Sequence, residues 1–289
     1  MAMTRGLALV LACALLSMAG PRAQAGLTAY DSFSDTPVGA PLIATSNSGT
    51  GFTGPWHPGG FNASIFANYT IANGSLSDGS LLTAGNSVST AAQQAISGLS
   101  RDLATPLGAA GTTAYLSVLL RPEGVLDAGA FGGFFGLYLN ASTNAPGVSN
   151  DVFIGKPGTS DAYVVEDRGG TNRHLTNATA TVGQTVLLVL RADFTSGIDR
   201  FTLYVNPTPG GAEPLSGTVK QDSDVGTISS LTLYSTGAFS VDEIRIGTTF
   251  ADVVPAAVPE PSSLVLVALG GIGAFGAARM RTSRRRLKS

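Results

Sequence analysis

Cysteine is almost missing from this chain, because Cys13 is the only one among 289 residues. It lies in an apolar run near the N-terminus, so a chain that starts after this run has no disulfide, thiol nucleophile or thiolate ligand. Acylation of Cys13 in a lipoprotein is an alternative, but Leu11 occupies a position where a small residue is usual. Histidine and tryptophan are also scarce, with only His57, His174 and Trp56.

The first 25 residues have the anatomy of a secretory signal. Arg5 gives a positive start, and residues 6–18 form an apolar run too short to span a bilayer. We therefore predict a signal peptide over residues 1–25 that is removed by signal peptidase. The cleavage site is formed by the small residues Ala23, Ala25 and Gly26.

Basic residues are few in the middle of the chain. Residues 26–254 carry nine basic and eighteen acidic side chains, a net charge of −9. Such a surface repels phosphate groups and anionic headgroups, so we expect no nucleic-acid partner.

Long helical patterns are also absent, and 37 glycines and 15 prolines predict frequent turns. Apolar and polar residues alternate in Thr113–Leu120 and Phe201–Val205, as in strands with one buried face. Residues 186–190 are apolar throughout, which predicts a central strand covered on both faces. We predict one all-β domain over residues 26–254, an antiparallel β-sandwich.

The segment near residue 243 predicts an irregular strand. Phe239 and Val241 have odd numbers, whereas Ile244 and Ile246 have even numbers. If all four point inward, one extra residue must be accommodated around Asp242–Glu243, which predicts a β-bulge.

Several segments together resemble one family of β-sandwiches. These segments are residues 30–33 (YDSF), 49–56 (GTGFTGPW), 100–103 (SRDL), 116–119 (LSVL), 199–207 (DRFTLYVNP) and 241–247 (VDEIRIG). The similarity is to the laminin-G-like domains with a concanavalin-like jelly roll, and it implies that fold over residues 30–253.

The C-terminus combines three features in a fixed order. An apolar stretch over residues 264–278 lies between a short proline motif and a basic end. The motif is Val258, Pro259, Glu260 and Pro261, and the basic end contains Arg279, Arg281, Arg284, Arg285, Arg286 and Lys288. This order resembles the bacterial PEP-CTERM sorting signal, which implies recognition by an exosortase-type membrane peptidase.

We divide residues 255–289 into a spacer (255–261), a membrane helix (262–278) and a basic tail (279–289). Seventeen helical residues extend about 25 Å, slightly less than a hydrocarbon layer of about 30 Å. The basic tail should stay in the cytoplasm and leave the motif at the outer face. Cleavage near the motif is the prediction from the resemblance, and a single-pass anchor that is never cut is the alternative.

Signals for catalysis are weak. No Gly-x-Ser-x-Gly motif accompanies the histidines, which stand in loop-like contexts. Glycosidases need two nearby carboxyl groups, and the adjacent pairs are Glu166–Asp167 and Asp242–Glu243. Adjacent strand residues point to opposite faces, so we expect neither pair to be catalytic and predict that the domain is not an enzyme.

The sequence offers few candidate ligand sites. Trp56 stands in a predicted loop, where its ring could stack on a glycan. Its match to the family's early tryptophan favours a role in packing the domain instead. We predict no cofactor and no metal, with structural calcium as a minor alternative. The oxygen ligands for calcium would be Asp222 with Asp224, Asp31 with Asp35, or Asp193 with Asp199.

Three functions follow in order of preference. The first is an exported, non-enzymatic protein of the cell envelope or extracellular matrix. The second is a lectin-like carbohydrate-binding module with exopolysaccharide as a partner, and the third is a polysaccharide hydrolase.

Overall fold

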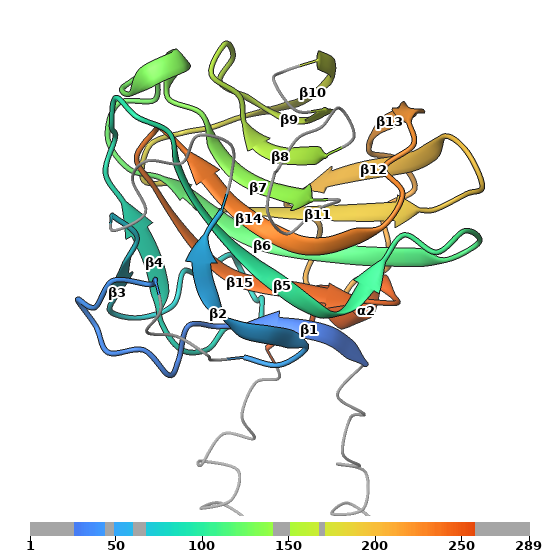
Figure 1. The fold of residues 1–289 in the computed structure, drawn as a ribbon, viewed down its shortest axis with the longest axis horizontal. Coiled ribbons are helices and arrows are strands. Elements are labelled where there is room, and N and C mark those ends of the chain that lie inside the picture. Colours follow the sequence, from blue (N-terminus) through green and yellow to red (C-terminus); the bar gives the residue numbers. More distant parts are fainter. Residues whose placement is uncertain (1–25, 44–48, 60–67, 141–150, 168–170, 258–289) are drawn as a thin grey trace, which may run out of the picture. The chain divides into compact units, whose positions relative to one another are not determined.

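Two antiparallel β-sheets pack face to face and form a β-sandwich, as predicted (Figure 1). The structure is a computed structural model, and it describes residues 26–43, 49–59, 68–140, 151–167 and 171–257. Within these residues the only helical segments are the 3-10 turn η1 (Ala130–Gly132) and the short helix α2 (Phe250–Val253). The compact unit extends to Ala256.

The first sheet has the order β13-β12-β11-β6-β15-β4-β3, and β1 pairs with β15 beside this path. Its strands in the described chain are β1 (Leu27–Asp31), β3 (Thr70–Ala72), β4 (Ser87–Thr90), β6 (Thr113–Pro122), β11 (Val186–Asp193), β12 (Asp199–Val205), β13 (Thr218–Ser223) and β15 (Phe239–Gly247).

The second sheet has the order β10-β9-β8-β7-β14-β5-β2. Its strands in the described chain are β2 (Phe52–Pro58), β5 (Ser97–Leu107), β7 (Phe135–Asn140), β8 (Val152–Lys156), β9 (Ala162–Asp167), β10 (Thr171–Thr179) and β14 (Ile228–Ser235).

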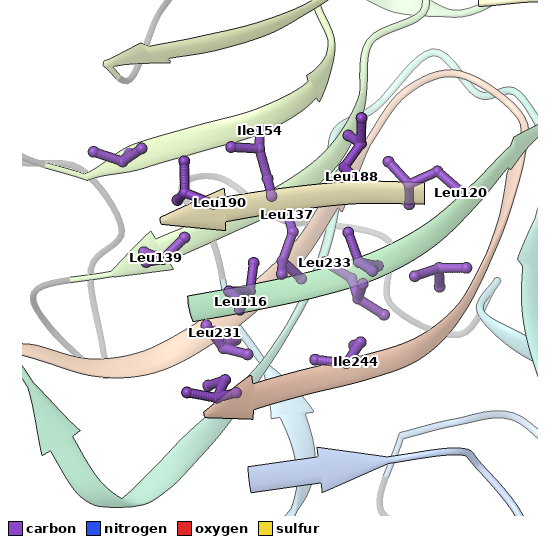
Figure 2. Close-up of a cluster of buried hydrophobic side chains, with 14 of the residues drawn as sticks. Leu116, Leu120, Leu137, Leu139, Ile154, Leu188, Leu190, Leu231, Leu233 and Ile244 are labelled. Carbon is purple, nitrogen blue, oxygen red and sulfur yellow. The ribbon is translucent and has the colours of Figure 1, made fainter. Parts of the chain in front are cut away.

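Alternating leucines from both sheets fill the space between them (Figure 2). β6 contributes Leu116 and Leu120 from the first sheet, and β14 contributes Leu231 and Leu233 from the second. Each side chain of this size removed from water stabilises the fold by about 1.5–3 kcal/mol. The alternation along each strand therefore joins the two sheets in one core.

The apolar strand β11 is central, as predicted. It lies between β12 and β6. Leu188 and Leu190 point into the core between the sheets, whereas Leu187 and Val189 join a second apolar cluster. This second cluster includes Phe250, Val253 and Val254 and covers the opposite face of the first sheet. Both faces of β11 are thus buried, which explains its unbroken apolar sequence.

The predicted bulge in β15 is confirmed. The pairing register of β15 with β6 shifts between Asp242 and Arg245, and Glu243 has a φ of 54°. Phe239, Val241, Ile244 and Ile246 all lie in the core, as the prediction required. The extra residue restores the inward direction of the last two side chains.

A C-terminal strap, residues Val254 to Ala256, ends the domain. The backbone amide of Gly210 donates to the carbonyl of Val254, and that of Leu82 donates to Pro255. Ala256 forms a bridge with Leu81. The first two residues of the predicted spacer are therefore paired with the folded domain.

Candidate functional site

A network of charged and phenolic groups lies on the face of the first sheet that carries the second apolar cluster. Glu213, in the loop between β12 and β13, accepts hydrogen bonds from the hydroxyl groups of Tyr204 (2.7 Å) and Tyr115 (2.8 Å). Arg191 of β11 donates to Glu213 (3.2 Å) and, through Nε, to both oxygens of Asp193 (3.0 Å). β6, β11 and β12 thus hold the carboxylate of the loop in one position.

The electrostatics of this network keep Glu213 ionised. Burial alone would raise the pKa of its carboxyl group, but the hydrogen bonds from Tyr204, Tyr115 and Arg191 lower it below its usual value. Burial and the neighbouring Glu213 carboxylate raise the pKa of Tyr115 to about 12. At neutral pH the phenols therefore stay protonated and act as donors to an anionic acceptor.

Two open hollows adjoin this network. One has a volume of about 400 Å³ and is lined by Tyr115, Arg191 and Glu213 with residues 248–251. The other has a volume of about 670 Å³, and its lining includes Arg191, Asp193, Arg200, Thr202, Glu213 and Leu215. The larger hollow contains two guanidinium groups and two carboxylates, so its formal charges balance.

Trp56 lies elsewhere, and the interpretation of it as a glycan contact is wrong. It is a strand residue of β2 and its side chain is 0% exposed. Its indole Nε1 donates to Asp31 (3.0 Å), which also accepts a hydrogen bond from Arg101. A ring enclosed in this way cannot stack on a sugar, and the packing role that the family resemblance implied is the one observed.

The two histidines also lie on strands rather than in loops. His57 is on β2, with Nε2 3.3 Å from Asp102. His174 is on β10, with Nε2 2.9 Å from Asp222. Both side chains are about one third exposed, but the prediction that they stand in loops was wrong.

The carboxylates of Asp242 and Glu243 face the same neighbour, which contradicts the expectation for adjacent strand residues. The hydroxyl group of Ser75 lies 2.5 Å from Asp242 Oδ2 and 3.5 Å from Glu243 Oε1. The β-bulge in β15 interrupts the alternation of side chains between the two faces of the sheet at this point. The two residues are 0% and 1% exposed, and Glu243 also pairs with Arg245. A polymer substrate therefore has no access to this pair.

The pair Glu166–Asp167 follows the expected alternation. Glu166 pairs with Arg173 of β10, whereas Asp167 lies beside Lys220 of β13. Burial raises the pKa of Glu166, although its ion pair with Arg173 opposes this. The two carboxylates have different partners and do not form one site.

The candidate calcium ligands bind other groups. Asp31 pairs with Arg101, Asp193 with Arg191, and Asp222 with Lys220. Asp199 accepts hydrogen bonds from two backbone amides. In the part of the chain that the structure describes, no group of three or more His, Cys, Asp or Glu side chains could hold a metal ion.

The predicted export and sorting residues lie outside the described residues. These are Ala23 and Ala25 of the signal, the motif Val258–Pro261, and the arginines at 279, 281, 284, 285 and 286. No helix in the described ranges is long and apolar enough to cross a membrane.

Comparison with known families identifies the C-terminal segment. Residues 257–281 match the PEP-CTERM protein-sorting motif. The chain thus carries the signal of exported proteins that are processed by an exosortase-type membrane protease. No curated protein matched the sequence.

Solved structures with similar folds include enzymes and a carbohydrate-recognition domain. The endo-1,3-β-glucanase of Streptomyces sioyaensis has a TM-score of 0.46 at 11% identity and covers 78% of this chain and 97% of its own. The GH131 β-glucanase catalytic domain of Podospora anserina has a TM-score of 0.43 at 11% identity, and the match covers 71% of this chain and 89% of that domain. The Emp46p carbohydrate recognition domain has a TM-score of 0.39 at 10% identity, and the match covers 73% of this chain and 95% of that domain. Similarity at this level does not distinguish between these functions.

Sequence reasoning missed the Arg191–Glu213 network. Arg191 directly follows the apolar run of β11, and Glu213 stands in a loop rich in glycine and proline. Their separation of 22 residues follows no motif, so only the pairing of β11 with β12 brings them together.

Proposed function

We propose that the domain is a non-enzymatic β-sandwich that is exported, sorted through Val258–Pro261, and retained in the cell envelope or the exopolysaccharide matrix. The PEP-CTERM motif supports export and sorting. The burial of Asp242 and Glu243 supports the absence of catalysis, because the adjacent carboxylates that share one neighbour cannot reach a substrate. Glu213, the partly exposed carboxylate between the two hollows, is held ionised and is unsuited to act as a general acid.

Release of reducing ends from polysaccharides tests this proposal. The purified chain should release none from neutral β-glucans or from acidic exopolysaccharide. Release that disappears in the Glu213→Gln variant but persists in Glu123→Gln would contradict it. Glu123 is a suitable control, because its partly exposed side chain pairs with Arg121 outside the hollows.

A second candidate function is binding of a neutral saccharide in the larger hollow. Arg191, Arg200, Asp193 and Glu213 offer both donors and acceptors with no net charge, which suits hydroxyl groups rather than an ionic ligand. The hydrogen bonds of Glu213 fix this arrangement before a ligand arrives, which lowers the entropic cost of binding.

Titration with neutral oligosaccharides would test the second function. Glu213→Gln should weaken binding by about ten-fold or more, because a hydrogen bond to a charged group contributes about 1.5–3 kcal/mol. Glu123→Gln should leave binding unchanged. Equal affinity of both variants and the natural chain would exclude the hollow as the site.

A further inference from the structure

A second charged cluster, separate from the hollows, joins the edges of the two sheets. Lys220 of β13 is 0% exposed, and its Nζ lies 3.0 Å from Oδ1 of Asp167 at the end of β9. Asp167 is itself 3% exposed. β13 is the edge strand of the first sheet, and β9 belongs to the second, so this amine and carboxyl group meet across the sandwich.

The two oxygens of Asp167 have different surroundings. Oδ2 accepts hydrogen bonds from Asn172 Nδ2 and Ser223 Oγ, both at 2.7 Å. Oδ1 accepts no hydrogen bond within the described residues, and its 3.0 Å contact with Lys220 is an ion-pair contact only. Two donors on one oxygen polarise a carboxyl group and can stabilise negative charge that develops there.

Asp222 occupies the position of a proton acceptor. Lys220 Nζ donates to Asp222 Oδ1, and Asp222 Oδ2 lies 2.9 Å from His174 Nε2. The second contact fixes the orientation of the carboxylate, as a third group does in nucleophile–base arrangements. Ser223 Oγ and the carbonyl of Asn172 also accept from Nζ, at 3.0 and 3.4 Å.

We propose that this cluster forms an intramolecular isopeptide bond between Lys220 Nζ and Asp167 Cγ. Lys220 is the nucleophile and Asp167 is the electrophile. Asp222 acts as the base, and Asn172 and Ser223 form the oxyanion-stabilising pair. The reacting groups are held by strands of both sheets, so the reaction needs no other protein.

The step is balanced without an oxidant, a reductant or a leaving group other than water. Asp222 takes a proton from the Lys220 ammonium group and passes it to Oδ1 of Asp167, and the neutral amine then attacks Cγ of the protonated carboxyl group. The carbon–nitrogen bond forms, and Oδ2 carries the negative charge of the tetrahedral intermediate. Nitrogen then loses a second proton through Asp222, and the bond from Cγ to Oδ1 breaks. Both protons leave with Oδ1 as water, so an ammonium and a carboxylate become an amide.

The surroundings favour the product. A buried ion pair carries a desolvation penalty that a neutral amide does not. The bond also closes a long loop, and such a crosslink restricts the unfolded chain as a disulfide would. The described chain contains no cysteine for that purpose.

Peptide mapping of the purified full chain tests the proposal. A protease digest should contain a branched peptide that joins the segments around Asp167 and Lys220, lighter by one water molecule than the two linear peptides together. Cleavage by trypsin after Lys220 should be blocked. Recovery of only the two linear peptides from folded protein would overturn the proposal.

Variants separate the roles of the residues. Lys220→Arg keeps the positive charge but cannot form the amide, so the branched peptide should vanish. Asp222→Asn should slow its formation while the fold, checked by circular dichroism, is kept. Lys156→Arg is the matched control, because Lys156 is also buried and lies 3.7 Å from Asp161; it should leave the branched peptide unchanged. A water loss that maps to Asp78–Gly79, where an aspartimide can form, would also overturn the proposal.

Discussion

Asp31 shows how one side chain can hold several parts of the core. It accepts hydrogen bonds from Arg101 of β5, from Trp56 of β2 and from the backbone amide of Phe33. The guanidinium group of Arg101 also lies 4.5 Å from the centre of the Phe52 ring. A charge inside the sandwich is therefore surrounded by partners from three segments.

Replacement of Asp31 by alanine should leave the charge of Arg101 buried and uncompensated. We expect a loss of about 3–5 kcal/mol in the free energy of unfolding, the usual effect of removing one partner of a buried pair. Glu123→Ala breaks a partly exposed pair with Arg121 and should cost about 0–1 kcal/mol. Urea denaturation of both variants compares the two effects, and equal losses would contradict this account.

Asp242 should make stability depend on pH. Burial and the nearby Glu243 raise its pKa to about 8, against 3.8 for an unperturbed side chain, although hydrogen bonds from Ser75 and Leu76 oppose the shift. Between these values the folded state binds more protons than the unfolded state. The free energy of unfolding should therefore fall as pH rises from about 4 to about 8.

The variant Asp242→Asn should flatten this part of the profile. Its amide does not titrate, so the stability that the natural chain loses toward pH 8 should be smaller or absent in the variant. Thermal unfolding at several pH values measures this. A matched surface change, Glu123→Gln, should keep the slope of the natural chain, and an unchanged slope in Asp242→Asn would refute the assignment.

Individual side chains were the least predictable part of the sequence. Trp56 lies among glycines and prolines, which predicts a loop, but β2 pairs with β5 and buries the ring. The contact of Lys220 with Asp167 joins residues that are 53 positions apart and depends on how the two sheets close. Local patterns contain no information about such distant pairs.

At the scale of elements, the bulge in β15 determines which side chains enter the core. Deletion of Glu243 would remove the extra residue, and a shift of one residue turns a strand's side chains to the opposite face. Ile244 and Ile246 would then leave the core, so we expect loss of the fold. Deletion of Leu215, a fully exposed loop residue, should be tolerated. Near-ultraviolet circular dichroism and soluble yield distinguish the two variants.

The positions of strands were more predictable than the contacts of individual side chains, because the spacing of apolar residues along a strand reflects which of its faces are buried. The continuous apolar run of β11 and the change of parity in β15 both identified real features. The same bulge made the opposite-face rule fail for Asp242 and Glu243. A rule that assumes regular pleating cannot hold where the strand is irregular.

At the scale of the whole molecule, the boundary after Ala256 predicts which truncations fold. A chain that ends at Ala257 keeps the C-terminal strap and should unfold at the same temperature as the natural domain. A chain that ends at Ala238 lacks β15, which lies between β6 and β4, and should not fold. Calorimetry on both chains checks this, and a cooperative transition in the shorter chain would contradict it.

The pairing of β1 with β15 joins the beginning of the domain to its end. Leu27 lies opposite Gly247, so the sheet is complete only when nearly the whole domain is available. Pairs of such long sequence separation form late, because a large loop must close first. A chain that is translocated across a membrane from its N-terminus consequently stays incompletely folded until its last strand has passed. It therefore remains competent for translocation until that point.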